Sequence, residues 1–147
     1  MESFKPLCAI QDGISEQLYK CFGEQYEIYP EEVKQGLKKP CFFIKLIKPS
    51  FTKERDEIYY AENLYCVHFF PENTKEPKAE CYATLDRLYM ALELIEINGN
   101  PVRGIGMNGE IHDEILQFHV NYNVFVRRVN DPIMMETLEI IDFRTKG

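Results

Sequence analysis

Two stretches of the chain repeat apolar residues at intervals of three and four, which is the spacing of one face of an α-helix. The first covers residues 7–22 and follows Pro6, a residue well suited to the first turn of a helix. The second begins at Pro77, and its apolar positions continue to Ile95. The pattern therefore predicts one amphipathic helix over residues 7–22 and another over residues 77–95.

Other stretches alternate apolar and polar residues with the period of two that is typical of β-strands. Segments 41–47 and 58–70 are rich in aromatic and β-branched side chains, and a short extended piece is expected at residues 26–29. The polar sequence PSFTKERDE lies between the two longer segments and is typical of a hairpin tip. The sequence therefore predicts a long β-hairpin that reaches beyond the compact part of the domain.

Short strands separated by turns are expected beyond residue 94, where Asn98-Gly99 and Asn108-Gly109 form turn-favouring pairs. Residues 116–126 then alternate apolar and mainly polar side chains over eleven positions, which predicts one long strand. Its expected partner is the segment before Asp113-Glu114. The pair Asn108-Gly109 fits either the turn of that hairpin or a bulge in the partner strand.

The order of helix, strands, helix and strands is typical of an α+β domain. With 147 residues, of which 45% are hydrophobic and 13% aromatic, the chain can bury the core of one domain spanning residues 1–147. The tail after Pro132 fits either a last strand or a contact with a neighbouring molecule. We therefore expect a mainly antiparallel β-sheet with two α-helices packed on one face and a long protruding β-hairpin.

The net charge of −7 argues against a protein that coats nucleic acid, because such a protein needs surplus basic charge to neutralise phosphates. No apolar run approaches the roughly 20 residues that a membrane span requires. The first ten residues also lack the basic and apolar regions of a signal peptide. We expect a soluble, non-secreted protein with no membrane contact.

The basic side chains are concentrated in one region of the sequence. Residues 34–55 carry seven Lys or Arg and one Glu, a charge of +6, whereas residues 1–33 carry −5 and residues 56–147 carry −8. Opposite charges on one molecule favour head-to-tail self-association, because complementary charge helps to set register and orientation in a ring. A hairpin whose lysines only maintain solubility explains the charge equally well.

Sequence motifs for catalysis or metal binding are weak. Gly104–Gly109 matches the G-x-G-x-x-G dinucleotide fingerprint, but the residues that follow are strand-like where the fingerprint requires a helix. The five cysteines form no C-x-x-C pair and indicate small buried thiols in a reducing compartment, and no histidine has a second His or Cys at chelating spacing. We expect no catalytic residue, cofactor or metal. The alternative is a small cytosolic ligand-binding or enzymatic α+β domain that uses Gly104–Gly109 and His112.

The segment Glu27–Ile44, EIYPEEVKQGLKKPCFFI, is similar to the segment that marks the tail terminator proteins of long-tailed bacteriophages and prophages. Three further features agree with the resemblance. They are the first amphipathic helix, the sequence FFPEN at residues 69–73 before the second helix, and PIMMETL at residues 132–138. The resemblance extends over nearly the whole chain, and its most specific part runs from VKQG to CFFI.

This resemblance implies a structural virion protein, not an enzyme, that assembles in the host bacterial cytoplasm. It implies a homo-oligomeric ring, typically a hexamer, on the head-proximal end of the tail tube, where the ring stops tube polymerisation and offers a surface for head joining. The implied partners are the tail tube protein, head-tail connector proteins and the genome DNA that passes through the lumen without specific binding. The alternative is that the protein is another component of the head-tail connector, which would have the same partners. We expect the subunit or tube interface to use Lys34, Gln35, Lys38, Lys39, Lys48, Lys53, Arg55, Arg127 and Arg128.

Overall fold

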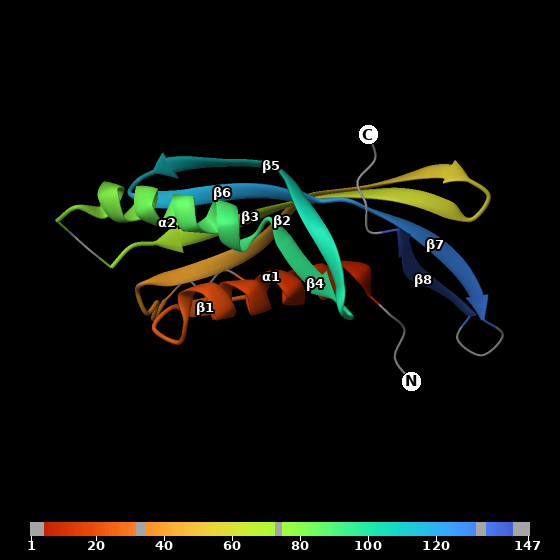
Figure 1. Cartoon of the computed structure of the whole chain (residues 1–147), viewed down its shortest axis with the longest axis horizontal. Coiled ribbons are helices and arrows are strands. Elements are labelled where there is room, and N and C mark those ends of the chain that lie inside the picture. The colour runs from red at the N-terminus through yellow and green to blue at the C-terminus, as the bar shows by residue number, and fades with distance from the viewer. Residues whose placement is uncertain (1–4, 32–34, 73–74, 132–134, 143–147) are drawn as a thin grey trace.

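The structure, a computed structural model, describes residues 5–31, 35–72, 75–131 and 135–142 (Figure 1). It confirms an α+β fold in which a curled, mainly antiparallel sheet is combined with two helices. The elements are α1 (Pro6–Phe22), β1 (Glu27–Tyr29), β2 (Cys41–Arg55), β3 (Ile58–Phe70), α2 (Pro77–Ala91), β4 (Leu94–Ile97), β5 (Asn100–His112), β6 (Ile115–Tyr122), β7 (Val124–Asp131) and β8 (Met135–Asp142).

The first helix, α1, forms where the sequence predicts it and begins at Pro6. Gly13, in the middle of the helix, is buried where α1 crosses β4. A Cβ atom at this position would lie 3.0 Å from the carbonyl oxygen of Glu96 and 3.3 Å from Ile95 Cδ1. The glycine therefore lets the helix backbone approach the strand closely, which offsets its poor helix propensity.

The second helix, α2, is shorter than its apolar spacing predicts. It ends at Ala91, and the Leu92 N–H donates to the Leu88 carbonyl over 2.9 Å to complete the last turn. Ile95, expected on the same helix, lies in β4 instead and is fully buried. The prediction of a helix to residue 95 is wrong because the spacing of apolar residues reports burial, and burial continues where the helix gives way to a strand.

The sheet has the strand order β1-β2-β3-β6-β5-β4, with β1 parallel to β2 and the other pairs antiparallel. It branches at β3. Leu64–Phe69 of β3 pair with β6, whereas Ile58–Ala61 pair with β7, which in turn pairs with β8. The long strand predicted over residues 116–126 is therefore interrupted at Asn123, where β6 ends and β7 begins. The tail after Pro132 contributes β8, the last strand of this branch.

The structure also distinguishes between a hairpin turn and a strand bulge at Asn108-Gly109. The turn between β5 and β6 lies at Asp113-Glu114, as expected, and both residues have positive φ angles. Asn108 and Gly109 lie within β5 and pair with β6, and the register shift of this ladder lies between Ile105 and Asn108. The pair is thus not the hairpin turn, and a bulge directly precedes it.

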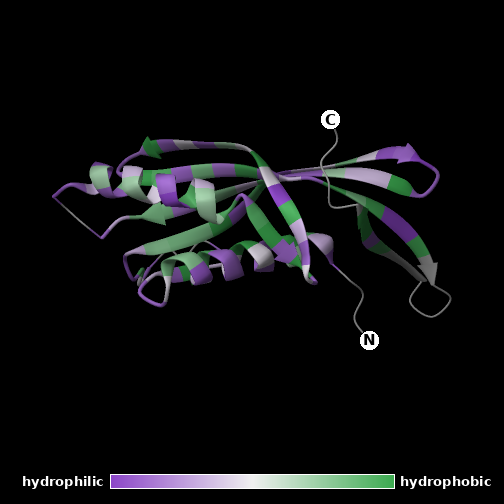
Figure 2. Ribbon diagram, viewed as in Figure 1, coloured by the Kyte–Doolittle hydropathy of each residue, from purple (hydrophilic) through white to green (hydrophobic). Residues whose placement is uncertain are grey.

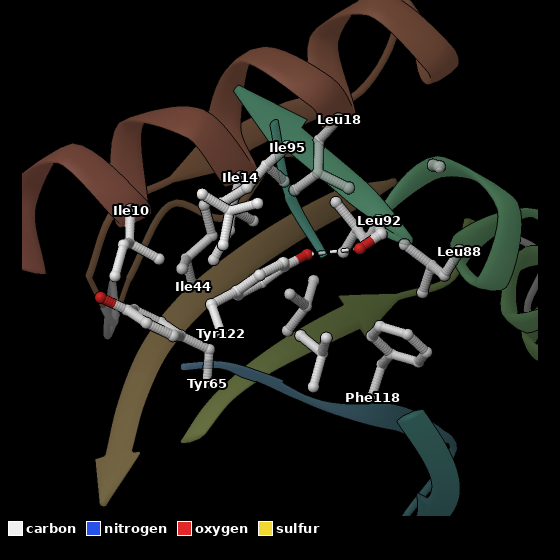
Figure 3. Packing of buried hydrophobic residues seen from close by; sticks show 14 of the residues in the cluster. Ile10, Ile14, Leu18, Ile44, Tyr65, Leu88, Leu92, Ile95, Phe118 and Tyr122 are labelled. Atoms are coloured by element: carbon white, nitrogen blue, oxygen red, sulfur yellow. Dashed lines mark hydrogen bonds between the residues drawn. The ribbon is translucent and has the colours of Figure 1, made fainter. Parts of the chain in front are cut away.

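Both helices lie on the same face of the sheet and enclose one apolar cluster (Figure 3). The hydroxyl of Tyr122 donates to the Leu92 carbonyl over 2.5 Å, and the hydroxyl of Tyr65 donates to the Leu7 carbonyl over 2.9 Å. Burial raises the pKa of both phenols. The largest fully buried side chains are Tyr65, Tyr122, Phe42, Phe69, Phe118, Ile10, Ile14, Leu18, Ile44, Leu88, Leu92 and Ile95.

We call the part of the sheet farthest from α2 the blade. It consists of Lys48–Arg55 of β2, Ile58–Ala61 of β3, and the whole of β7 and β8 (Figure 1). The predicted hairpin of β2 and β3 is formed, and hydrophilic residues gather at its tip (Figure 2). Since β7 pairs with β3 here, the hairpin is one part of a wider sheet. Its protrusion beyond the domain as a separate arm stays a prediction.

Candidate subunit interface

The expected interface residues fall on two parts of the structure. Gln35, Lys38 and Lys39 lie in the connection between β1 and β2, and all three are exposed. The Lys38 backbone N–H donates to the hydroxyl of Tyr29 over 3.3 Å. The Tyr29 ring packs edge-on against Phe43, which ties this connection to the first residues of β2. Lys34 lies outside the described residues.

The second group lies on the blade. Lys48, Lys53 and Arg55 are exposed on β2, and Arg127 and Arg128 are exposed on β7. Arg127 forms an ion pair with Glu139 of β8. The Nε of Arg128 lies 3.8 Å from Glu57 Oε2, and its guanidinium carbon lies 5.5 Å from the centre of the Tyr59 ring.

The two groups lie far apart. They are separated by the first half of β2, because Lys48 is the eighth of the fifteen residues of this strand, which begins at Cys41 and ends at Arg55. At a rise of about 3.3 Å per residue, Cys41 and Lys48 lie roughly 23 Å apart. The predicted interface residues therefore form two patches, with the exposed Lys45 on the strand between them. They are a loop patch (Gln35, Lys38 and Lys39) and a blade patch (Lys48, Lys53, Arg55, Arg127 and Arg128).

Two buried asparagines fix the blade to the rest of the sheet. Asn63 and Asn123 are 2% and 5% exposed and lie where β3 changes its partner from β6 to β7. The Asn63 backbone N–H donates to Asn123 Oδ1 over 3.0 Å, and Asn63 Nδ2 donates to the Tyr122 carbonyl over 3.0 Å. These bonds satisfy polar groups that the change of partner would leave unpaired. This pair was not among the residues predicted from the sequence, where its one signal is amide residues among buried strand positions.

The aromatic side chains of the blade lie on both of its faces. Phe51 stacks on Tyr59 with ring centroids 4.4 Å apart, and Tyr60 contacts Phe125 at 4.9 Å. Ile58, Phe125 and Ile141 line an open groove of about 270 Å³ beside the hairpin tip, together with Glu54 and Arg55. The blade therefore carries accessible apolar surface as well as charge.

The glycine-rich segment does not adopt the strand, turn and helix arrangement that the dinucleotide fingerprint requires. Gly104–Gly109 lie within β5, and the chain continues along this strand to His112 with no helix at its end. A Cβ atom at Gly104 would lie 2.7 Å from the Leu92 carbonyl oxygen, so this glycine serves close backbone packing. The exposed His112 Nε2 lies 2.6 Å from Glu110 Oε2, and this histidine holds the pKa of the Glu110 carboxyl below its usual range.

The cysteines divide into two classes. Cys41, Cys66 and Cys81 are buried, as predicted, and burial raises the pKa of the Cys41 and Cys66 thiols to about 11. Cys8 and Cys21 are exposed on α1, so the prediction of buried thiols is wrong for these two. Within the described ranges, no three His, Cys, Asp or Glu side chains cluster as a metal site would require.

No helix in the described part of the chain has the length and apolar character needed to cross a membrane.

Among curated proteins, none matches this sequence. A family model described as phage tail terminator protein matches residues 9–134, which run from the first turns of α1 past the end of β7. The match covers most of the 147 residues, and the chain belongs to the phage tail terminator family, whose members are structural proteins of the phage tail.

Proposed function

We propose that this protein forms a ring on the head-proximal end of the phage tail tube, where it stops tube polymerisation and offers the surface for head joining. The observation that carries the proposal is the family match over residues 9–134, which includes most of α1, all of α2 and seven of the strands. The ring is a homo-oligomer, a hexamer, assembled in the host bacterial cytoplasm. Its partners are the tail tube protein on one side and the head-tail connector proteins on the other.

The proposed ring acts by shape and charge. A subunit that covers the growing end of the tube blocks the surface on which the next tube subunit would add, and this needs no bond making or breaking. The net charge of −7 also suits a ring around the genome, because acidic walls do not retain DNA phosphates. The polarity between the basic patches and the acidic remainder supports a head-to-tail arrangement of copies.

The test is the mass of the purified protein by light scattering over a concentration series, alone and with polymerising tail tube subunits. Electron microscopy of tube ends completes it. We expect closed rings, or density at one end of shortened tubes. A protein that stays monomeric and leaves tube length unchanged at every concentration contradicts the proposal. Thermal stabilisation by nucleotides or metals would then favour the small ligand-binding domain as the function.

The loop patch is the first target for substitution. We expect Lys38→Glu combined with Lys39→Glu to weaken ring formation, because both side chains are exposed and basic. The matched control is Lys20→Glu combined with Lys78→Glu, which makes the same change of charge on exposed positions of α1 and α2. If the loop variant forms the ring at the same concentration as the wild type, these two lysines have no part in the interface.

A further inference from the structure

The blade is a four-stranded antiparallel sheet with the order β2-β3-β7-β8. Both of its outer strands have one unpaired edge in the described part of the chain. The strand β1 pairs with β2 only at Cys41–Phe43, so β2 has no neighbour along Lys48–Arg55. The strand β8 pairs with β7 alone. An unpaired edge presents a row of free N–H and C=O groups and is a template for another strand.

The two edges carry opposite charge. Residues 48–55 of β2 contain three basic side chains and one acidic, which gives +2. Residues 135–142 of β8 contain three acidic side chains and no basic one, which gives −3. Complementary charge favours contact between the β2 edge of one copy and the β8 edge of another, and it opposes contact of either edge with its own kind.

The two edges also differ in features that discourage strand pairing. The β2 segment contains Pro49 and two lysines, and its ladder with β3 shifts register between Leu46 and Lys48 and again near its end. Lysines, prolines and bulges are devices that protect an exposed edge. The eight residues of β8 contain no lysine and no proline. Because Pro49 has no N–H to donate, the part of β2 open to a partner is Ser50–Arg55.

Strand direction determines how copies join. Successive strands in the order β2-β3-β7-β8 alternate in direction, so β2 and β8 run oppositely. In a ring whose axis runs roughly along these strands, the rotation that relates one copy to the next leaves the direction of each strand unchanged. The β8 strand of one copy therefore meets β2 of the next as an antiparallel pair, which continues the alternation. Such a contact joins two different surfaces, and it closes into a ring when the rotation between neighbouring copies is a whole fraction of a turn.

We propose that β8 of one copy pairs antiparallel with Ser50–Arg55 of β2 in the next copy, so that the blades form a continuous sheet around the ring. The groove lined by Ile58, Phe125 and Ile141 adjoins this seam and gives it apolar surface. This inference rests on the proposed ring function and specifies its subunit contact. A two-fold contact of β8 with β8 would produce only dimers and is the competing arrangement.

Engineered disulfides test the pairing, because they form only between strands whose Cβ atoms lie about 4 Å apart. Ladder pairing places Ser50, Thr52 and Glu139 on the same face of the blade, through Glu62, Tyr60, Phe125 and Arg127. Cysteines are introduced as Ser50→Cys with Glu139→Cys, and as Thr52→Cys with Glu139→Cys, so that two registers are sampled. The background carries Cys8→Ser and Cys21→Ser, which removes the exposed native thiols.

Rings or capped tubes of each variant are oxidised and separated on a denaturing gel. We expect at least one pair to give a ladder of covalent oligomers up to the full ring. The control, Thr52→Cys with Tyr82→Cys, places the second thiol on the exposed face of α2 and should give no ladder. Circular dichroism and light scattering establish that each variant folds and assembles before oxidation.

The outcomes separate this inference from the proposed function. If the variants form rings or cap tubes and neither pair gives a ladder, the strand pairing is wrong and the ring function stands. If the single variant Glu139→Cys in the same background gives covalent dimers on oxidation, the two-fold contact of β8 with β8 is correct and the inference is overturned. If the parent protein neither forms rings nor affects tubes, the proposed function itself fails.

Discussion

Asn123 holds the branch point of the sheet, and its replacement by alanine should destabilise the protein. The substitution removes the Oδ1 atom that accepts the Asn63 backbone N–H at 3.0 Å, in a site where both residues are 5% exposed or less. A buried N–H group left without a partner costs about 1–3 kcal/mol.

We therefore expect the free energy of unfolding to fall by about 2 kcal/mol, which raises the ratio of unfolded to folded protein roughly 30-fold. For a chain of this size, the melting temperature should fall by about 4–8 °C. The neighbouring bond from Asn63 Nδ2 to the Tyr122 carbonyl remains, so the site is weakened and not abolished.

Urea unfolding followed by circular dichroism measures the effect, with all proteins at one concentration because assembly adds to apparent stability. The control is Asn100→Ala, at an exposed position of β5, where a change within about 0.5 kcal/mol is expected. Hydrogen exchange gives a second measurement, since the Asn63 amide should lose protection in the variant. Equal stability of Asn123→Ala and Asn100→Ala would refute the assignment of Asn123 as the support of the branch.

Three further predictions concern backbone and thiol packing. Gly104→Ala should lower the free energy of unfolding by about 1–3 kcal/mol, because the new Cβ would lie 2.7 Å from the Leu92 carbonyl oxygen, and thermal unfolding measures this loss. At pH 8, a thiol reagent should modify only Cys8 and Cys21 of the native protein, and mass spectrometry identifies the modified sites. Burial raises the pKa of Cys66 to about 11, so unfolded thiols ionise first and the free energy of unfolding should fall as the pH rises above about 9. Rapid labelling of Cys66 at pH 8, or stability that does not change between pH 8 and 10, would contradict this account.

Burial patterns predicted the faces of the elements better than their boundaries. The spacing of apolar residues identified Ile95 as a core residue, and the structure buries it completely. The same spacing wrongly predicted that Ile95 lies on the helix. The strand β4 packs against the same core as α2, so the spacing of apolar residues continues past the end of the helix. Alternation likewise continues through Asn123, with Tyr122 and Val124 both buried on one side. An alternation with a period of two shows which face of the sheet a residue occupies, but it does not show which strand the residue pairs with. The alternation therefore could not reveal that β6 ends and β7 begins at Asn123.

The interface residues stay a prediction. Charge counts locate the basic region in the sequence, but they contain no distances and could not show that the first half of β2 lies between the two patches. The resemblance stated from Glu27–Ile44 is confirmed by the family match over residues 9–134. Unpaired strand edges depend on partners that are distant in sequence, so local pattern could not locate them. A single domain over residues 1–147 stays a prediction.

The shared β3 strand has a consequence for folding. Its first residues support the blade through β7, and its last residues support β6, β5 and β4. If β3 leaves the sheet, both halves lose a paired strand. The part of β3 around Asn63 therefore links the order of the blade to the order of the rest of the sheet, and this link reaches the seam where copies would meet.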